Sequence, residues 1–201
     1  MLDIFVVSKK KDNEQRVLVD VISRNAKRLQ RLTEDILDVT RIESQSLNLK
    51  KEIFNLNEIV INVLAEYENR IGSKNNVKIT FVSKGDFIVE GDRGRLGQVL
   101  SNFIGNAIKF TQEGNIDISL EKMQNDKAVV LSVKDTGSGI DHDIMPRLFT
   151  KFATRSNVGT GLGLYISKSI IEAHGDRIWA ENNSNGKGAT ITFILPLLIA
   201  H

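Results

Sequence analysis

The stretch SVKDTGSGIDHD, residues 132–143, ends a predicted strand on an acidic residue and then breaks into a glycine turn. The strand begins at about residue 128, where AVVLSVKD reads as a half-buried β-strand, and the glycines stop that pattern. Asp135 therefore either caps the turn or faces a ligand. The other motifs of the sequence decide between these two interpretations.

Length, composition and charge set the first limits on function. The chain has 201 residues, of which 41% are hydrophobic and 26% charged, and its net charge is +2. This is enough for one globular core with an appendage, and the balanced charge predicts no nucleic-acid partner. The absence of cysteine excludes disulfides and thiolate metal sites. The sequence contains no apolar run that approaches about 18 residues and no signal-peptide pattern. We therefore expect a cytoplasmic region, and a membrane anchor outside these residues stays open.

Residues 12–45 contain neither Gly nor Pro and predict one long helix. A heptad seam runs along it, with spacings that alternate between four and three residues: Leu18, Ile22, Asn25, Leu29, Leu32, Ile36 and Val39. Asn25 interrupts the seam with a polar side chain, as register-setting positions of coiled coils do. The seam favours packing against other helices and leaves open both a homodimer through this helix and packing against its own domain.

The remaining sequence predicts helices and strands that interleave without regular βαβ spacing. A second helix of about four turns is expected within residues 54–76, where Asn55 and Glu58 have capping-box spacing. Further helices are expected over residues 92–111 and 162–175. Strands are expected over residues 77–83, 87–92, 115–123, 128–135, 177–182 and 188–196. This order indicates an α+β domain, a mixed sheet with helices on one face.

Three short motifs carry the chemistry: NFIGNAIKFT at 102–111, DTGSGI at 135–140 and GTGLGL at 159–164. A glycine cluster before a helix offers backbone N–H groups to a phosphate. Asn102, Asn106 and Lys109 share one helix face, where amide oxygens beside a triphosphate suit Mg²⁺. Alone, each motif also fits a flexible turn or a solvated helix. No P-loop motif occurs, and GTGLGL lacks the spacing of a dinucleotide fingerprint.

In this order the three motifs resemble the N, G1 and G2 boxes of the ATP-binding catalytic domain of sensor histidine kinases. That superfamily, GHKL, also contains gyrase B, Hsp90 and MutL. The resemblance covers about residues 50–197, and IMPRLFTKF at 144–152 is similar to the F box. Residues 24–44 resemble the second helix of the dimerisation and phosphotransfer domain. The resemblance implies a two-layer α/β sandwich of Bergerat type over residues 51–201, preceded by a truncated dimerisation helix over residues 1–50.

The resemblance also implies roles for individual residues. Asp135 would accept a hydrogen bond from the adenine 6-amino group, which a guanine carbonyl could not donate. The other residues expected beside the adenine are Phe110, Gly137, Gly139 and Ile140. Asn106 would hold Mg²⁺, and Asn102 and Lys109 would serve the phosphates as catalytic residues. The phosphate end of the ATP lid would consist of Gly159, Thr160, Gly161, Leu162 and Gly163.

Two features of the sequence depart from the family pattern. The H-E-x-x-x-P context of a phosphoacceptor histidine does not occur in these residues, and the three histidines are His142, His174 and His201. Ala189 stands where the family usually has a hydroxyl residue beside the base. We therefore expect ATP and Mg²⁺ as ligands, and γ-phosphoryl transfer to a histidine of another domain, in cis or in trans. A response regulator would be the further partner in two-component signalling.

Other functions stay open at this point. A non-catalytic, nucleotide-dependent dimerisation module would also lack an acceptor histidine. A GHKL ATPase would need a general base, and no Glu lies between Asp92 and Phe110, where those relatives carry one. A serine kinase shares the boxes but usually lacks the long heptad helix.

Overall fold

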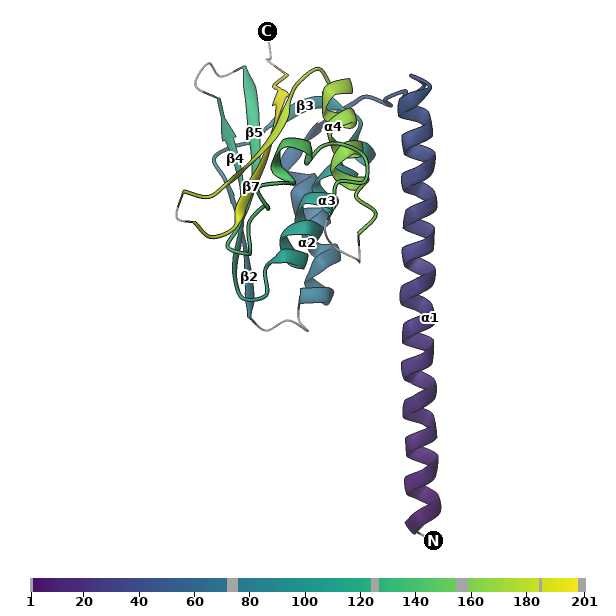
Figure 1. Ribbon diagram of the computed structural model, residues 1–201. Coiled ribbons are helices and arrows are strands. Elements are labelled where there is room, and N and C mark those ends of the chain that lie inside the picture. The colour runs from purple at the N-terminus through teal and green to yellow at the C-terminus, as the bar shows by residue number, and fades with distance from the viewer. Residues whose placement is uncertain (1, 72–75, 124–126, 155–158, 185, 199–201) are drawn as a thin grey trace.

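The computed structural model describes residues 2–71, 76–123, 127–154, 159–184 and 186–198. Figure 1 shows a compact α+β domain beside one long helix, whose N-terminal half extends beyond the domain. Within the described residues, no helix is both long enough and apolar enough to cross a bilayer.

The described residues form four α-helices and seven strands. The helices are α1 (Leu2–Glu43), α2 (Leu56–Ile71), α3 (Arg93–Phe110) and α4 (Gly163–Ala173), with one 3-10 turn, η1 (Met145–Arg147). The strands are β1 (Glu52–Asn55), β2 (Val77–Ser83), β3 (Ile88–Gly91), β4 (Gly114–Lys122), β5 (Ala128–Asp135), β6 (Ile178–Asn182) and β7 (Ala189–Pro196).

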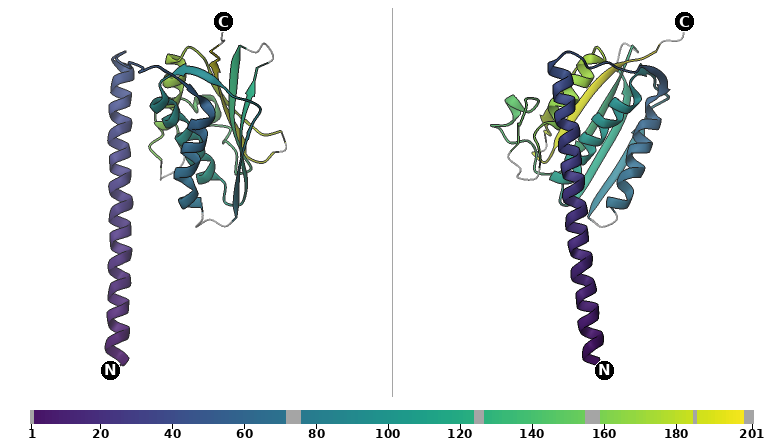
Figure 2. Two further views of the ribbon diagram at one scale, coloured as in Figure 1. Left: turned by 180° about the vertical axis from the view of Figure 1, so that it is seen from behind. Right: turned by 90° about the vertical axis from the view of Figure 1, so that its right-hand side faces the viewer.

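The main sheet has the order β2-β4-β5-β7-β6, with β2 parallel to β4 and the other pairs antiparallel. Helices α2, α3 and α4 cover one face of this sheet (Figures 1 and 2). The predicted α+β fold, a mixed sheet with helices on one face after a long helix, is therefore confirmed.

Helix α3 joins the sheet to the other helices. Asp92 caps its N-terminus by accepting a hydrogen bond from the Arg95 N–H at 3.0 Å. On the sheet side, the rings of Phe103 and Phe193 pack edge to face with centroids 5.9 Å apart, and both are fully buried. Toward the neighbouring helix, the Tyr67 hydroxyl of α2 donates to the Ser101 carbonyl at 2.9 Å. These contacts fix α3 against both the sheet and α2.

Two local features differ from the sequence prediction. Strand β1 pairs with β3 in a separate two-stranded sheet, and its four residues are too short for a periodic signal. The capping box is incomplete: Asn55 Oδ1 accepts from the Asn57 N–H at 3.0 Å, but Glu58 forms an ion pair with Arg93 at 2.9 Å. A tertiary contact thus replaces the reciprocal bond of the capping box.

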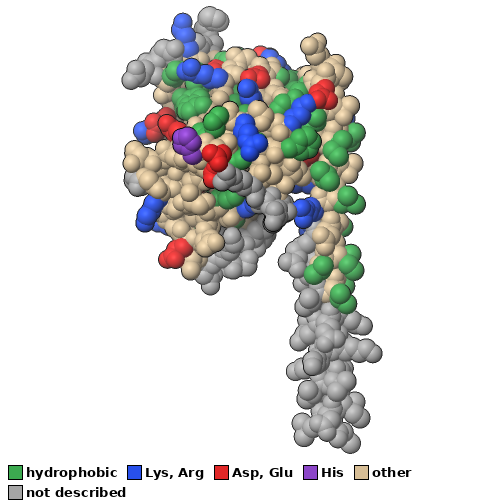
Figure 3. Space-filling model, viewed as in Figure 1, with side chains coloured by type: hydrophobic (Ala, Val, Ile, Leu, Met, Phe, Trp, Pro, Cys, Tyr) green, Lys and Arg blue, Asp and Glu red, His purple; other side chains and the backbone are tan. Residues whose placement is uncertain are grey.

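Helix α1 faces the domain with polar side chains. Asp35 and Asp38 are buried there, whereas Ile22, Leu29 and Ile36 of the heptad seam are 66%, 65% and 52% exposed. Figure 3 shows hydrophobic side chains along the outer side of this helix. The C-terminal end of the seam is different, because Val39 packs against the domain core. Most of the seam is therefore left exposed by the part of the chain that the structure describes.

His174 ties the end of α4 to the start of α3. Its Nδ1 lies 2.7 Å from the Ile170 carbonyl, and its Nε2 accepts a hydrogen bond from the Asp92 N–H at 2.9 Å. The ring is therefore neutral, with the proton on Nδ1. Burial lowers the pKa of His174 below its ordinary value of 6.5. These contacts give His174 a structural role.

This lowered pKa predicts a pH dependence of stability. The unfolded chain binds a proton near pH 6.5 and the folded ring does not, so the contribution of His174 is complete above pH 6.5 and is lost as the pH falls below it. One proton limits the slope to about 1.4 kcal/mol per pH unit. Urea unfolding between pH 7.5 and 5.5 should give a shallower slope for His174→Gln than for the wild type. His142→Gln, at an exposed position, is the control; an unchanged slope in His174→Gln would contradict this role.

Candidate functional site

A cavity of about 1000 Å³ lies between α3, the end of β5, the loop before α4 and the middle of α1. Eleven of the residues expected from the sequence line it: Asn102, Asn106, Lys109, Phe110, Asp135, Gly139, Ile140, Gly159, Thr160, Gly161 and Gly163. Gly137 and Leu162 are not in its wall. Motifs up to about 60 residues apart thus meet around one space.

Asp135 ends β5 and is buried at the cavity wall. Its Oδ1 accepts hydrogen bonds from the backbone N–H groups of Gly137, at 2.8 Å, and Ala189, at 3.3 Å. Burial raises the pKa of this carboxyl group, and the two hydrogen bonds act in the opposite direction. Among the described residues none donates to Oδ2, so this oxygen is available to a ligand.

The glycine turn after β5 is required by close backbone contacts. A Cβ atom on Gly137 would lie 2.4 Å from the Phe110 carbonyl oxygen, at the end of α3. Gly139 has a φ of +73°, and a Cβ there would lie 2.9 Å from Asn182 Oδ1. These glycines therefore let the turn pack between α3 and β6, and Gly139 also borders the cavity.

Asn102 is buried at the junction of α3 and α4. Its Nδ2 donates to Ser167 Oγ at 3.1 Å, and its Oδ1 accepts a long hydrogen bond from Arg31 of α1 at 3.4 Å. A Cβ on Gly163 would lie 2.3 Å from the same Oδ1. The amide thus joins three helices at the cavity wall.

Asn106 and Lys109 follow on the same face of α3, and both are half-buried in the cavity wall. The Lys109 ammonium lies 4.9 Å from the centre of the Phe110 ring. Burial lowers the pKa of Lys109, and the positive charges of Arg31 and Arg28 lower it further. Positive charge from two helices is therefore concentrated at this part of the cavity.

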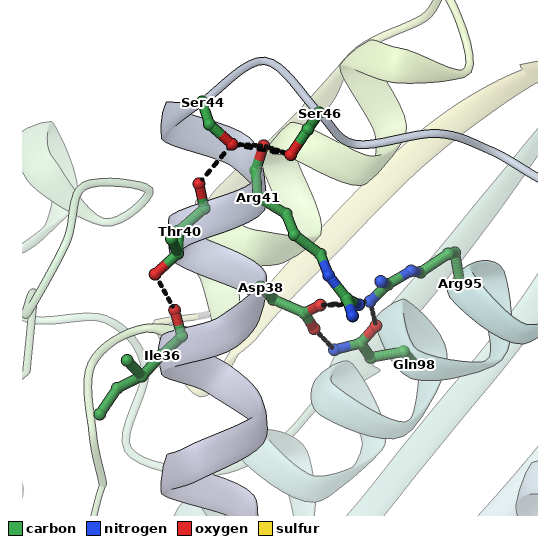
Figure 4. Close-up of polar contacts among 8 residues, drawn as sticks. All are labelled: Ile36, Asp38, Thr40, Arg41, Ser44, Ser46, Arg95 and Gln98. Atoms are coloured by element: carbon green, nitrogen blue, oxygen red, sulfur yellow. Dashed lines mark hydrogen bonds and ion pairs between the residues drawn. The ribbon is translucent and has the colours of Figure 1, made fainter.

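Helix α1 contributes contacts that the sequence did not predict. Asp35 Oδ2 accepts a hydrogen bond from Thr160 of the glycine loop at 2.9 Å, and burial raises the pKa of this carboxyl group. Asp38 accepts from Arg95 and Gln98 of α3, both at 2.7 Å (Figure 4). In the sequence, the signal that could have indicated these contacts is the pair Asp35 and Asp38, which are three residues apart and lie outside the heptad seam.

Gly188 is a further residue that the sequence did not indicate. Its φ is +75°, and a Cβ there would overlap the carbonyl oxygen of Asp135. It precedes Ala189, whose N–H binds the Asp135 carboxylate. The start of β7 therefore reaches Asp135 only because this position has no side chain. The family resemblance also implies that Thr154 and Arg155 belong to the ATP lid; Thr154 lines the cavity, and Arg155 lies outside the described residues.

Sequence models of two protein families match the chain. The family described as histidine kinase-, DNA gyrase B-, and HSP90-like ATPase matches residues 91–199, which is more than half of the chain. The chain belongs to this family. The His Kinase A (phospho-acceptor) domain matches residues 1–45, which include all of α1.

Solved histidine kinase structures have the same fold. Full-length ShkA in complex with AMPPNP is 29% identical with a TM-score of 0.79, over 93% of this chain and 40% of that chain. Acinetobacter baumannii AdeS is 28% identical with a TM-score of 0.76, over 91% of this chain and 85% of that chain. ThkA, solved with the response regulator protein TrrA, is 34% identical with a TM-score of 0.67, over 85% of this chain and 49% of that chain.

These similarities confirm the family resemblance. The chain is the ATP-binding catalytic region of a histidine kinase of the GHKL superfamily, with a helix of the phosphoacceptor domain before it. It spans less than half the length of ShkA and of ThkA.

Gly186 and Gly188 of this kinase region allow a matched test of the Asp135 environment. Both have positive φ, +74° and +75°, but a Cβ on Gly186 would meet nothing within 4 Å. Gly186→Ala should cost about 1–2 kcal/mol of stability from backbone strain alone. Gly188→Ala should cost about 1–3 kcal/mol more, because the new Cβ displaces Asp135. Urea unfolding of both variants measures this difference; equal losses would show that the contact with Asp135 is unimportant.

Proposed function

We propose that this kinase region binds ATP in the cavity and transfers its γ-phosphoryl group to a histidine of another domain. The observation that carries the proposal is the buried Asp135 carboxylate, held by two backbone N–H groups at one wall of a cavity that also contains Asn106 and Lys109. The match to histidine kinases supports the reaction type. AMPPNP in the ShkA complex supports an adenine nucleotide as the ligand.

Asp135 is the proposed adenine-binding residue. Its free Oδ2 can accept a hydrogen bond from the adenine 6-amino group, while the same oxygen would be unpaired against the guanine carbonyl. Phe110 and Ile140, which both line the cavity, would contact the faces of the base. Backbone N–H groups of the loop from Gly159 to Gly163, which leads into α4, are the proposed donors to the phosphates.

Magnesium is proposed to bind together with the nucleotide. The described residues contain no group of three His, Cys, Asp or Glu side chains that could hold a metal ion by themselves. Asn106 offers one neutral amide oxygen in the cavity wall, which fits Mg²⁺ when phosphates supply the negative charge. Bound Mg²⁺ would neutralise charge on the transferring phosphoryl group, and Lys109 and Asn102 would position the phosphates.

The acceptor histidine is proposed to come from a separate helical segment. His174 has both ring nitrogens in hydrogen bonds, and His142 is exposed in the segment that follows the glycine turn. The exposed heptad seam of α1 is the proposed surface for helices of the phosphoacceptor domain, in cis or in trans, and for a homodimer. We place the domain boundary near residue 50, and the catalytic region in the cytoplasm, where ATP is available.

A response regulator is the proposed final partner. ThkA, which resembles this chain over 85% of its length, was solved in complex with the response regulator TrrA. The phosphoryl group would pass from the acceptor histidine to such a protein.

Asp135→Asn should weaken ATP binding by about 1–3 kcal/mol, because the amide places a donor against the adenine amino group. The affinity for adenosine should fall by the same amount, because the substitution affects only the contact with the base. Titration calorimetry in the presence of Mg²⁺ measures both ligands.

Two variants serve as controls for this prediction. Asp117→Asn, at an exposed position on β4, should bind both ligands like the wild type. Asn106→Ala should lose the Mg²⁺-dependent part of ATP affinity but keep adenosine affinity. If Asp135→Asn bound ATP as tightly as the wild type, Asp135 would not be the adenine-binding residue.

Incubation of the chain with radiolabelled ATP should give no acid-labile phosphohistidine on the chain itself. Addition of a separate helical hairpin with an H-E-x-x-x-P acceptor should restore labelling in trans, at a rate limited by docking. Leu29→Glu, in the exposed seam, should reduce this labelling without lowering ATP affinity. Strong self-labelling mapped to His142, His174 or His201 would contradict the proposal.

A further inference from the structure

The wall of the cavity opposite the predicted nucleotide motifs is formed by α1. Val21, Asn25 and Arg28, which follow each other at helical spacings of four and three residues, line the cavity, as do Lys27 and Arg31. None of these residues belongs to the motifs from which the ATP site was predicted, which all lie between residues 102 and 164. Helix α1 therefore contributes a wall of its own to the cavity.

The charge on this wall is positive and converges with that of α3. Arg31 reaches Asn102 at 3.4 Å, and the charges of Arg28 and Arg31 both act on the Lys109 ammonium. The acidic residues that line the cavity, Asp135 and Asp141, belong instead to the end of β5 and the segment after it. Like charges gathered around one space repel each other, and an anion bound between them offsets this repulsion. Arg31 also acts on the Asp35 carboxyl group of its own helix, which does not line the cavity. The arrangement thus favours a polyanion between α1 and α3.

We propose that Arg28 and Arg31 of α1 bind the terminal phosphates of ATP, so that the nucleotide lies between this helix and the catalytic domain. This inference rests on the proposed ATP site and adds two residues to it. With adenine at Asp135, the triphosphate extends past Asn106 and Lys109 toward the cationic wall. Arginine suits this role because its planar guanidinium can donate two hydrogen bonds to one phosphate.

The arrangement couples nucleotide binding to the packing of α1. ATP that contacts both elements binds more tightly when α1 is docked, and by linkage it stabilises the docked arrangement by the same factor. The hydrogen bonds from Thr160 to Asp35 and from Arg95 to Asp38 hold α1 without a nucleotide. Because ADP lacks the γ-phosphate, it makes fewer contacts with the arginines and stabilises the docked helix less than ATP does.

Titration calorimetry on the full 201-residue chain with MgATP, MgADP and adenosine tests the proposal. Arg28→Ala and Arg31→Ala should each weaken ATP binding about tenfold, with a smaller loss for ADP and no loss for adenosine. Arg31→Lys should retain part of the ATP affinity, because it keeps the charge but not the planar donor geometry. Arg177→Ala is the matched control, because it removes an equal charge from an exposed side chain that stacks over Trp179, outside the cavity.

The possible results separate this inference from the function on which it rests. If the wild type binds ATP and the double variant Arg28→Ala/Arg31→Ala binds it equally tightly, the inference is overturned and the ATP site stands. An equal loss for ATP and adenosine also overturns it, because the arginines would then act on the domain structure. If the wild type binds no ATP, the proposed function fails, and the inference fails with it.

Amide hydrogen exchange provides a second measurement that does not depend on affinity. ATP should slow the exchange of backbone amides in residues 18–43 more than adenosine does, and the double variant should lose this difference. Equal protection of α1 by ATP and adenosine in the wild type would overturn the proposed contact between the phosphates and the helix.

Discussion

The buried carboxylate of Asp135 is the constraint on which the site depends. A carboxylate removed from water must be met by donors, and here two backbone N–H groups, from Gly137 and Ala189, satisfy one of its oxygens. Both donors come from segments that approach closely only because Gly137 and Gly188 have no side chains. The end of β5, the turn after it and the start of β7 are thus organised around one side chain, and its second oxygen is left for the ligand.

Helix α3 connects this site to the core of the domain. One of its faces buries Phe103 against the sheet, while the other presents Asn102, Asn106 and Lys109 to the cavity. The packing of the apolar side chains of α3 against the sheet therefore determines where its polar side chains lie in the cavity. The same helix contacts α1 through Arg95 and Gln98, which both bind Asp38 (Figure 4). Core packing, ligand binding and the docking of the long helix all depend on this one element.

The sequence predicted those parts of the structure that depend on local patterns. Hydrophobic periodicity located α3 and the strands of the main sheet, and the glycine and asparagine motifs located most of the cavity wall. The contacts of α1 were not predicted, because the periodicity identifies its apolar seam, whereas the domain packs against polar side chains on another face. A bond such as Arg95 to Asp38 joins residues 57 positions apart, and no local pattern encodes it. Gly188 was missed for a similar reason, since its importance depends on the position of Asp135.

The central claim is that the cavity binds an adenine nucleotide through Asp135. The most direct measurement is titration calorimetry of the wild-type chain with ATP and with GTP, at equal Mg²⁺ and salt. The account predicts binding of ATP and an affinity for GTP that is at least about tenfold lower, because the guanine carbonyl leaves the buried carboxylate unpaired. Equal affinity for the two nucleotides would contradict it.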